Sequence, residues 1–172
     1  VRDVAGEEMR IFCIVPPGMC PGHFDLKPSE AKRLLRSRLV IAFDFQGGIG
    51  QLLPTDGRGP TLQTIDAPPG LCIPATYLAV VSQTASILSA AFPERAAAFA
   101  QRAADVAKRM AALEAECAAA IEAHRLQNAR VLTSPHQAVF AEWLGLEPAG
   151  TFAGRDVETV ANLNTAIQNA EK

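Results

Sequence analysis

The chain has 172 residues, of which 49% are hydrophobic and 20% charged, so it can form one domain or two small lobes with a buried core. Its formal net charge of −2 gives no sign of a nucleic-acid partner or an anionic membrane surface. It contains no run of about 20 apolar residues that would predict a membrane span, and its four cysteines are too few for a dense disulfide framework.

The first half of the chain predicts three strands and two helices. Short apolar, β-prone runs predict the strands, and spaced apolar residues predict the helices. In chain order the elements are a strand at 9–15, a helix at 29–37, strands at 39–45 and 61–65, and a helix at 75–91. Residues 47–59 are rich in turn-forming residues, which predicts irregular structure there.

A single long helix is predicted from Glu94 to about His124. Apolar side chains recur there at intervals of three and four residues and form one stripe, which contains Phe99, Ala103, Val106, Met110, Leu113, Cys117 and Ile121. At about 1.5 Å per residue such a helix is roughly 40 Å long or more. That length suits a helix shared by two lobes.

The last part of the chain predicts strand, helix, strand and helix, at 129–133, 136–145, 148–153 and 156–170. This alternation is typical of an α/β fold with parallel sheets. We expect two α/β lobes joined by a long backbone helix, with the second lobe incomplete. The expected division is an N-terminal lobe at 1–92, the linking helix at 93–127 and the start of a C-terminal lobe at 128–172, in a chain that is part of a longer protein.

Ligand-type side chains lie in loops that are rich in proline and glycine. Cys20 and His23 stand in the run PPGMCPGHFDLKPSE, Cys72 follows a Pro-Pro-Gly turn, and His136 follows Thr-Ser-Pro at the end of a predicted strand. Thiolate and imidazole suit zinc or another late first-row metal, and proline lowers the entropy lost on binding. These four residues are the predicted metal ligands, and we expect His136 in the first turn of the following helix.

Other interpretations of these residues stay open. Cys72 can instead form a disulfide with Cys20 in an oxidising compartment, or remain a buried thiol. Cys13 and Cys117 are expected to be buried small hydrophobic residues. Asp25 and Asp44 are predicted to orient a ligand histidine from the second coordination sphere, although solvated loop positions also explain them.

Three segments resemble the cluster A-I solute-binding proteins of ABC importers for zinc and manganese. VRDVAGEEMRIFCIVPPGMCPGHFDLKPSEAKRLLRSRLVIA is similar to the first ligand loop of this family with its Pro-Ser helix start. FPERAAAFAQRAADVAKRMAALEAEC is similar to its long backbone helix, and ARVLTSPHQAVFAEWLGLEPAGTF to the opening of its second lobe. The three segments occur in the order that the family has.

The chain departs from the family at each histidine position that it spans. Those positions fall on Gly22, near Pro69 and on Pro135, and a histidine or cysteine follows within a few residues in every case. The resemblance therefore implies a rebuilt metal site in the same loops. Mixed sulfur and nitrogen ligation favours Zn²⁺ over Mn²⁺, which prefers harder oxygen ligands.

The resemblance implies an extracytoplasmic solute-binding component of an ABC importer, periplasmic or anchored at the cell surface as a lipoprotein. Its partners would be a transition-metal ion and an ABC permease in the membrane, with no nucleic acid. The alternative is a binding or adhesion module that keeps the scaffold with an altered cleft. An enzyme is not expected, because no oxyanion-hole or nucleophile-elbow pattern accompanies Cys20.

Overall fold

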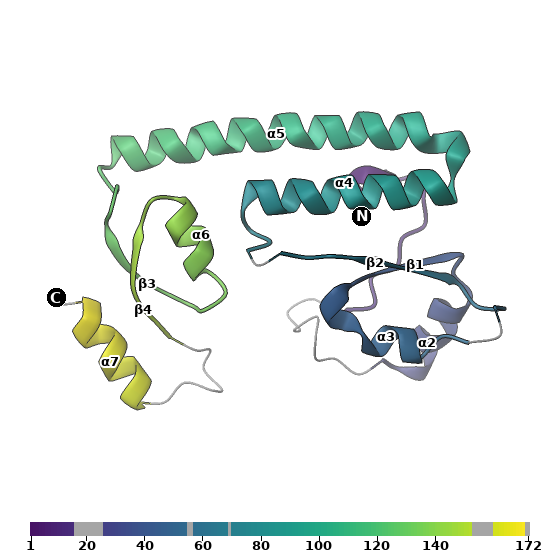
Figure 1. The fold of residues 1–172 in the computed structure, drawn as a ribbon, viewed down its shortest axis with the longest axis horizontal. Helices are drawn as coiled ribbons and strands as arrows, with labels where there is room; N and C mark the ends of the chain where they lie inside the picture. The colour runs from purple at the N-terminus through teal and green to yellow at the C-terminus, as the bar shows by residue number, and fades with distance from the viewer. Residues whose placement is uncertain (16–25, 55–56, 69, 153–159, 171–172) are drawn as a thin grey trace. The chain divides into compact units, whose positions relative to one another are not determined.

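The computed structural model describes residues 1–15, 26–54, 57–68, 70–152 and 160–170 (Figure 1). The chain divides into two compact units. The first unit contains Val1–Ala67 and Ala79–Val106, and the second contains Pro68–Leu78 and Ala107–Lys172. In the described part of the chain, no helix is both long enough and apolar enough to cross a membrane.

The sheet of the first unit is a parallel pair of strands, β1 (Leu39–Phe43) and β2 (Thr61–Ile65). The register pairs Leu39 with Thr61 and continues to Phe43 with Ile65. Alternate side chains of β1 point into a core on one face of the sheet. Helices α2 (Pro28–Leu35) and α3 (Gly48–Gln51) also contribute side chains to this core. The buried members of this core are Leu34, Val40, Ala42 and Ile49. The predicted strands at 39–45 and 61–65 and the helix at 29–37 are confirmed.

Two predictions for the first unit are wrong. Residues 9–15 form no strand, and within the described part of the chain no backbone–backbone hydrogen bond involves them. They have strand-forming side chains, and Ile14 packs against the core, but no neighbouring strand pairs with them. Residues 47–59 include the short helix α3, which forms because it buries Ile49. A 3₁₀ turn, η1 (Asp44–Gln46), precedes it.

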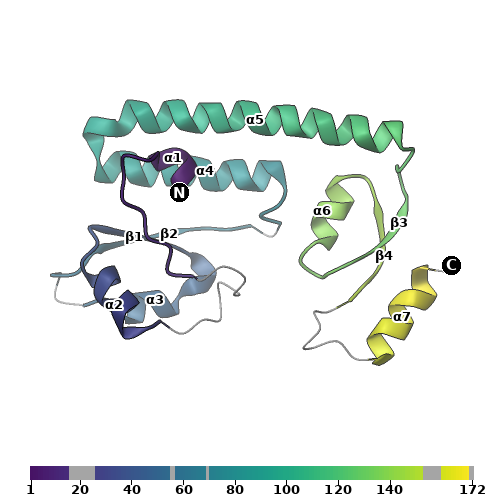
Figure 2. The same ribbon diagram turned by 180° about the vertical axis from the view of Figure 1, so that it is seen from behind.

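Helix α4 (Pro74–Ala91) is followed by a 3₁₀ turn, η2 (Pro93–Arg95), and by α5 (Ala96–Ala123). The predicted helix at 75–91 and the long helix after Glu94 are thereby confirmed. Within the first unit, α4 and the first part of α5 run antiparallel side by side (Figures 1 and 2). The α5 stripe buries Phe99 and Val106 completely. Both helices contribute residues to both units, since α4 is divided after Leu78 and α5 after Val106.

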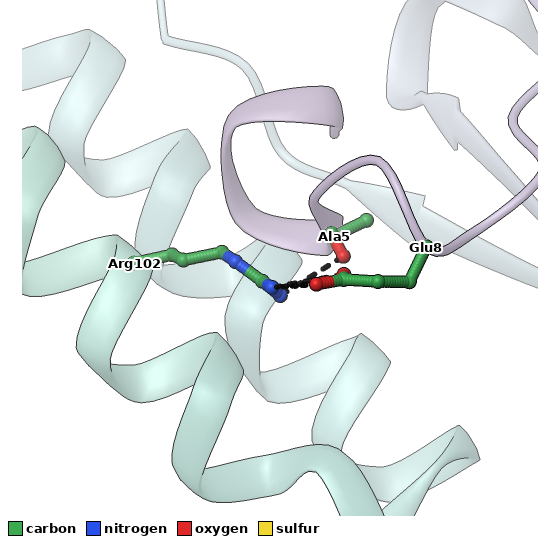
Figure 3. A network of polar contacts seen from close by, with 3 residues as sticks. All are labelled: Ala5, Glu8 and Arg102. Carbon is green, nitrogen blue, oxygen red and sulfur yellow. Dashed lines mark hydrogen bonds and ion pairs between the residues drawn. The ribbon is translucent and has the colours of Figure 1, made fainter.

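Arg102 of α5 holds the start of the chain in place (Figure 3). Its Nη2 lies 2.8 Å from Oε1 and 2.9 Å from Oε2 of Glu8. Its Nη1 donates to the backbone oxygen of Ala5 at 3.0 Å. Ala5 is the last residue of the short helix α1 (Arg2–Ala5). Gly6 lies between these two contacts with a φ of +76° and a ψ of −178°. That conformation is essentially restricted to glycine.

The second unit also has a parallel pair, β3 (Arg130–Thr133) and β4 (Glu147–Thr151), with an irregular register between Val131 and Leu132. Helix α6 (Ala138–Trp143) connects the strands, and α7 (Val160–Ala170) packs against both of them. The contact is close because an added Cβ on Gly150 would lie 3.3 Å from the Cα of Ala166. The predicted order and the α/β class with parallel sheets are confirmed. The division at 92 and 127 stays a prediction.

We expect the substitution Gly6→Ala to lower the free energy of unfolding by about 3 kcal/mol, through backbone strain and displacement of Arg102. The new Cβ would lie 2.6 Å from Cζ of Arg102. Urea denaturation measures the loss. Gly57→Ala is the control for a positive φ alone, because its φ is +75° and no atom of the described residues lies within 4 Å of the added Cβ, and it should cost only about 1 kcal/mol. Equal losses in the two variants would show that neither the ψ of Gly6 nor the Arg102 contact adds to the cost.

Candidate functional site

The predicted site residues divide between described and undescribed parts of the chain. Cys20, His23 and Asp25 lie outside the described residues. Cys72 and His136 belong to the second unit, and Asp44 belongs to the first. The site can therefore be built from the second unit and, separately, from the edge of the β1–β2 sheet.

Cys72 lies in a tight turn directly before α4. Gly70 opens the turn with a φ of +83°, and its carbonyl accepts a 2.8 Å hydrogen bond from the backbone N–H of Ile73. The Cys72 side chain is exposed, and among the described residues its thiol is free. An added Cβ on Gly70 would lie 3.3 Å from Cγ1 of Val139. The turn therefore packs against the first turn of α6.

His136 lies in the loop that joins β3 to α6. The backbone N–H of Gln137 donates to the carbonyl of Ser134 at 2.9 Å, and the Ser134 hydroxyl donates to Oε1 of Gln137 at 3.0 Å. The prediction that His136 occupies the first helical turn is wrong, because α6 begins only at Ala138. The histidine is exposed and stands two residues before the helix. The loops of His136 and Cys72 thus flank the same end of α6.

Asp44 follows β1 directly, and its Oδ1 accepts a 2.8 Å hydrogen bond from the N–H of Phe45. Asp66 follows β2 in the same way, so the parallel register brings both residues to one carboxyl edge. Gln83 of α4 fixes the backbone of Asp66 through two hydrogen bonds, of 3.0 and 3.1 Å. Sequence reasoning missed Asp66, although its position directly after a predicted strand was a usable signal.

Thr133 is a second residue that sequence reasoning missed. It ends β3, directly before the His136 loop, and is 8% exposed. In the described part of the chain its Oγ1 is buried without a hydrogen-bond partner. Threonine is common in strands, so the sequence does not indicate that this hydroxyl is buried without a partner. Leaving a buried hydroxyl unpaired costs about 1–3 kcal/mol.

The remaining cysteines differ from expectation. Cys13 was expected to be buried, but it is exposed, since the segment around it pairs with no strand. Cys117 is half-buried on α5. Among the described residues, no group of three or more histidine, cysteine and acidic side chains lies close enough to hold a metal ion. Cys72 and His136 therefore supply at most part of a donor set.

No family model and no curated protein matches the sequence. Solved structures do match the fold. The Mn-bound periplasmic metal-binding protein from Candidatus Liberibacter asiaticus superposes with a TM-score of 0.77 at 12% identity, covering 97% of this chain and 69% of that chain. ZnuA gives 0.76 at 16% identity, with 99% and 72% covered. Zn(II)-bound AdcA from Streptococcus pneumoniae gives 0.71 at 16% identity, with 95% and 39% covered.

These matches extend over nearly the whole chain, including both parallel sheets and the long helix. The chain therefore has the fold of periplasmic metal-binding proteins, as its resemblance to the cluster A-I family predicted. At 11–16% identity the likeness concerns the fold.

We expect Thr133→Val to leave stability unchanged or to raise it by about 1 kcal/mol, because it removes an unpaired buried hydroxyl with little change in shape. Thermal and urea unfolding measure the effect. Thr64→Val, at an exposed position of β2, is the control for strand propensity alone. A clear loss of stability in Thr133→Val would mean that the hydroxyl has a partner outside the described residues.

Proposed function

We propose that this protein is an extracytoplasmic metal-binding protein that captures a transition-metal ion and delivers it to an ABC permease. The observation that carries the proposal is the fold, which is shared along 97% of the chain with a Mn-bound periplasmic protein. Other structures of this fold are Cd-bound and Zn(II)-bound. The role is binding and transfer, and no catalytic step is assigned to any residue.

The proposed ligands are Cys20, His23, Cys72 and His136, with Asp25 and Asp44 as supporting groups. Cys72 and His136 are exposed and flank one end of α6, so an ion arriving from solvent can reach both. A thiolate and an imidazole are ligands that zinc accepts readily, whereas manganese prefers carboxylate and carbonyl oxygen. Zinc is therefore the proposed cargo, with manganese as the alternative.

Zinc titration by calorimetry tests this proposal on the longest natural chain, kept reduced. We expect about one zinc per chain. His136→Ala and Cys72→Ser should each weaken zinc binding at least about tenfold, since each removes a ligand worth more than about 1.4 kcal/mol. His124→Ala and Cys13→Ser are matched controls, because these residues are also exposed but stand outside the predicted ligand loops in the sequence. Equal effects of ligand and control variants would refute the assignment.

A second candidate is a binding or adhesion module that keeps the scaffold without transporting metal. One observation favours it: the family's histidine positions fall on Gly22, near Pro69 and on Pro135 in this chain, and none of them carries a histidine. Retained stability and partner binding in the doubly substituted His23→Ala/His136→Ala form, in a chain that takes up neither zinc nor manganese, would favour this candidate over metal capture.

A further inference from the structure

We propose a second binding site, for a small organic carboxylate, in a hollow of the first unit where β1 and β2 begin and α4 ends. The hollow has a volume of about 330 Å³. Its polar lining comes from Arg38, Thr61 and Gln63, and its apolar lining from Leu39 and the last turns of α4. A volume near 300 Å³ is at the lower end of the range for small-molecule sites.

Arg38 is held in place by three separate contacts. Its backbone oxygen accepts a 3.1 Å hydrogen bond from the N–H of Thr61. Its Nη2 donates to the backbone oxygen of Ala91 at 2.8 Å, and its Cζ lies 4.5 Å from the centre of the Phe92 ring. A guanidinium has five N–H donors in a fixed plane, and the contact with Ala91 uses only part of them. The side chain is thus positioned in advance and can pair with a carboxylate.

Thr61 and Gln63 extend the polar side of the hollow. They stand two residues apart on β2, so their side chains point to the same face of the sheet. Both are exposed, and in the described part of the chain neither side chain makes a hydrogen bond. Together they offer a hydroxyl and an amide beside the guanidinium. None of the described residues that line the hollow is acidic, and the hollow therefore favours an anion.

The apolar side of the hollow determines what kind of group the carboxylate of the ligand is attached to. Leu39, Ile87, Ala90 and Ala91 present methyl and methylene groups. A short hydrocarbon chain attached to a carboxylate matches this combination, with the carboxylate at Arg38 and the chain over the aliphatic side chains. The hollow lies at the amino ends of the strands, whereas Asp44 and Asp66 follow their carboxyl ends. The site is therefore separate from the loops of the proposed metal function.

Arg38 also has a structural role, since it satisfies a carbonyl at the end of α4, where a positive charge is favourable. That role predicts an effect of Arg38 on stability. It does not predict saturable binding of a small anion, so ligand binding distinguishes the two.

An NMR titration of the ¹⁵N-labelled protein with sodium butyrate, in the presence of a chelator, tests the proposal independently of metal binding. We expect saturable shifts of amides in residues 38–39, 61–63 and 87–92, with a Kd on the order of 1 mM. Butylamine has the same hydrocarbon chain with the opposite charge and should not cause them. Shifts that do not saturate, or that butylamine reproduces, would overturn the proposal.

Two variants assign the binding to the hollow. Arg38→Lys should weaken butyrate binding at least about tenfold, because a lysine cannot pair with a carboxylate through two parallel hydrogen bonds. Gln63→Leu leaves the Arg38 contacts intact and should weaken binding roughly threefold to tenfold. Arg36→Lys, an exposed arginine outside the hollow, is the matched control. Unchanged affinity in Gln63→Leu, or equal losses in Arg36→Lys and Arg38→Lys, would contradict the assignment.

Discussion

A sheet of two parallel strands cannot bury its own apolar faces, and this constraint governs both units. In the first unit, α2 and α3 supply Leu34 and Ile49 to one face of β1. In the second, α7 brings Ala166 so close to β4 that an added Cβ on Gly150 would contact the Ala166 backbone. Because each pair of strands depends on its helices, the polar contacts that position the helices also hold the sheets.

Those polar contacts are made by long side chains that reach backbone atoms far away in the sequence. Arg102 reaches the carbonyl of Ala5, Arg38 reaches that of Ala91, and Gln83 holds both backbone groups of Asp66. Each contact satisfies backbone groups at the end of an element, where helix and sheet hydrogen bonding stops. The loop that follows β2 thus begins from a defined position.

The two ends of the β1–β2 sheet differ in chemistry. The carboxyl edge carries Asp44 and Asp66, while Arg38 and Thr61 stand at the amino edge. Acidic groups suit cations, and a fixed guanidinium beside aliphatic side chains suits an organic anion. In the second unit, Cys72 and His136 add softer ligands beside α6. The proposed metal site and the proposed carboxylate site therefore rely on separate groups of residues.

Local pattern in the sequence was enough to predict β1, β2, α4, α5 and the parallel class, because each of these elements has a strong run or period of apolar residues. It was not enough for residues 9–15, because a strand also needs a neighbouring strand with which to exchange hydrogen bonds. It was also not enough for α3, because that helix depends on burying Ile49. Sequence reasoning singled out Cys72 and His136 as ligand types. Only the tertiary structure placed their loops beside one helix end, brought Asp44 and Asp66 to the same edge of a sheet, and left the hydroxyl of Thr133 buried. These relations join residues that are distant in the chain.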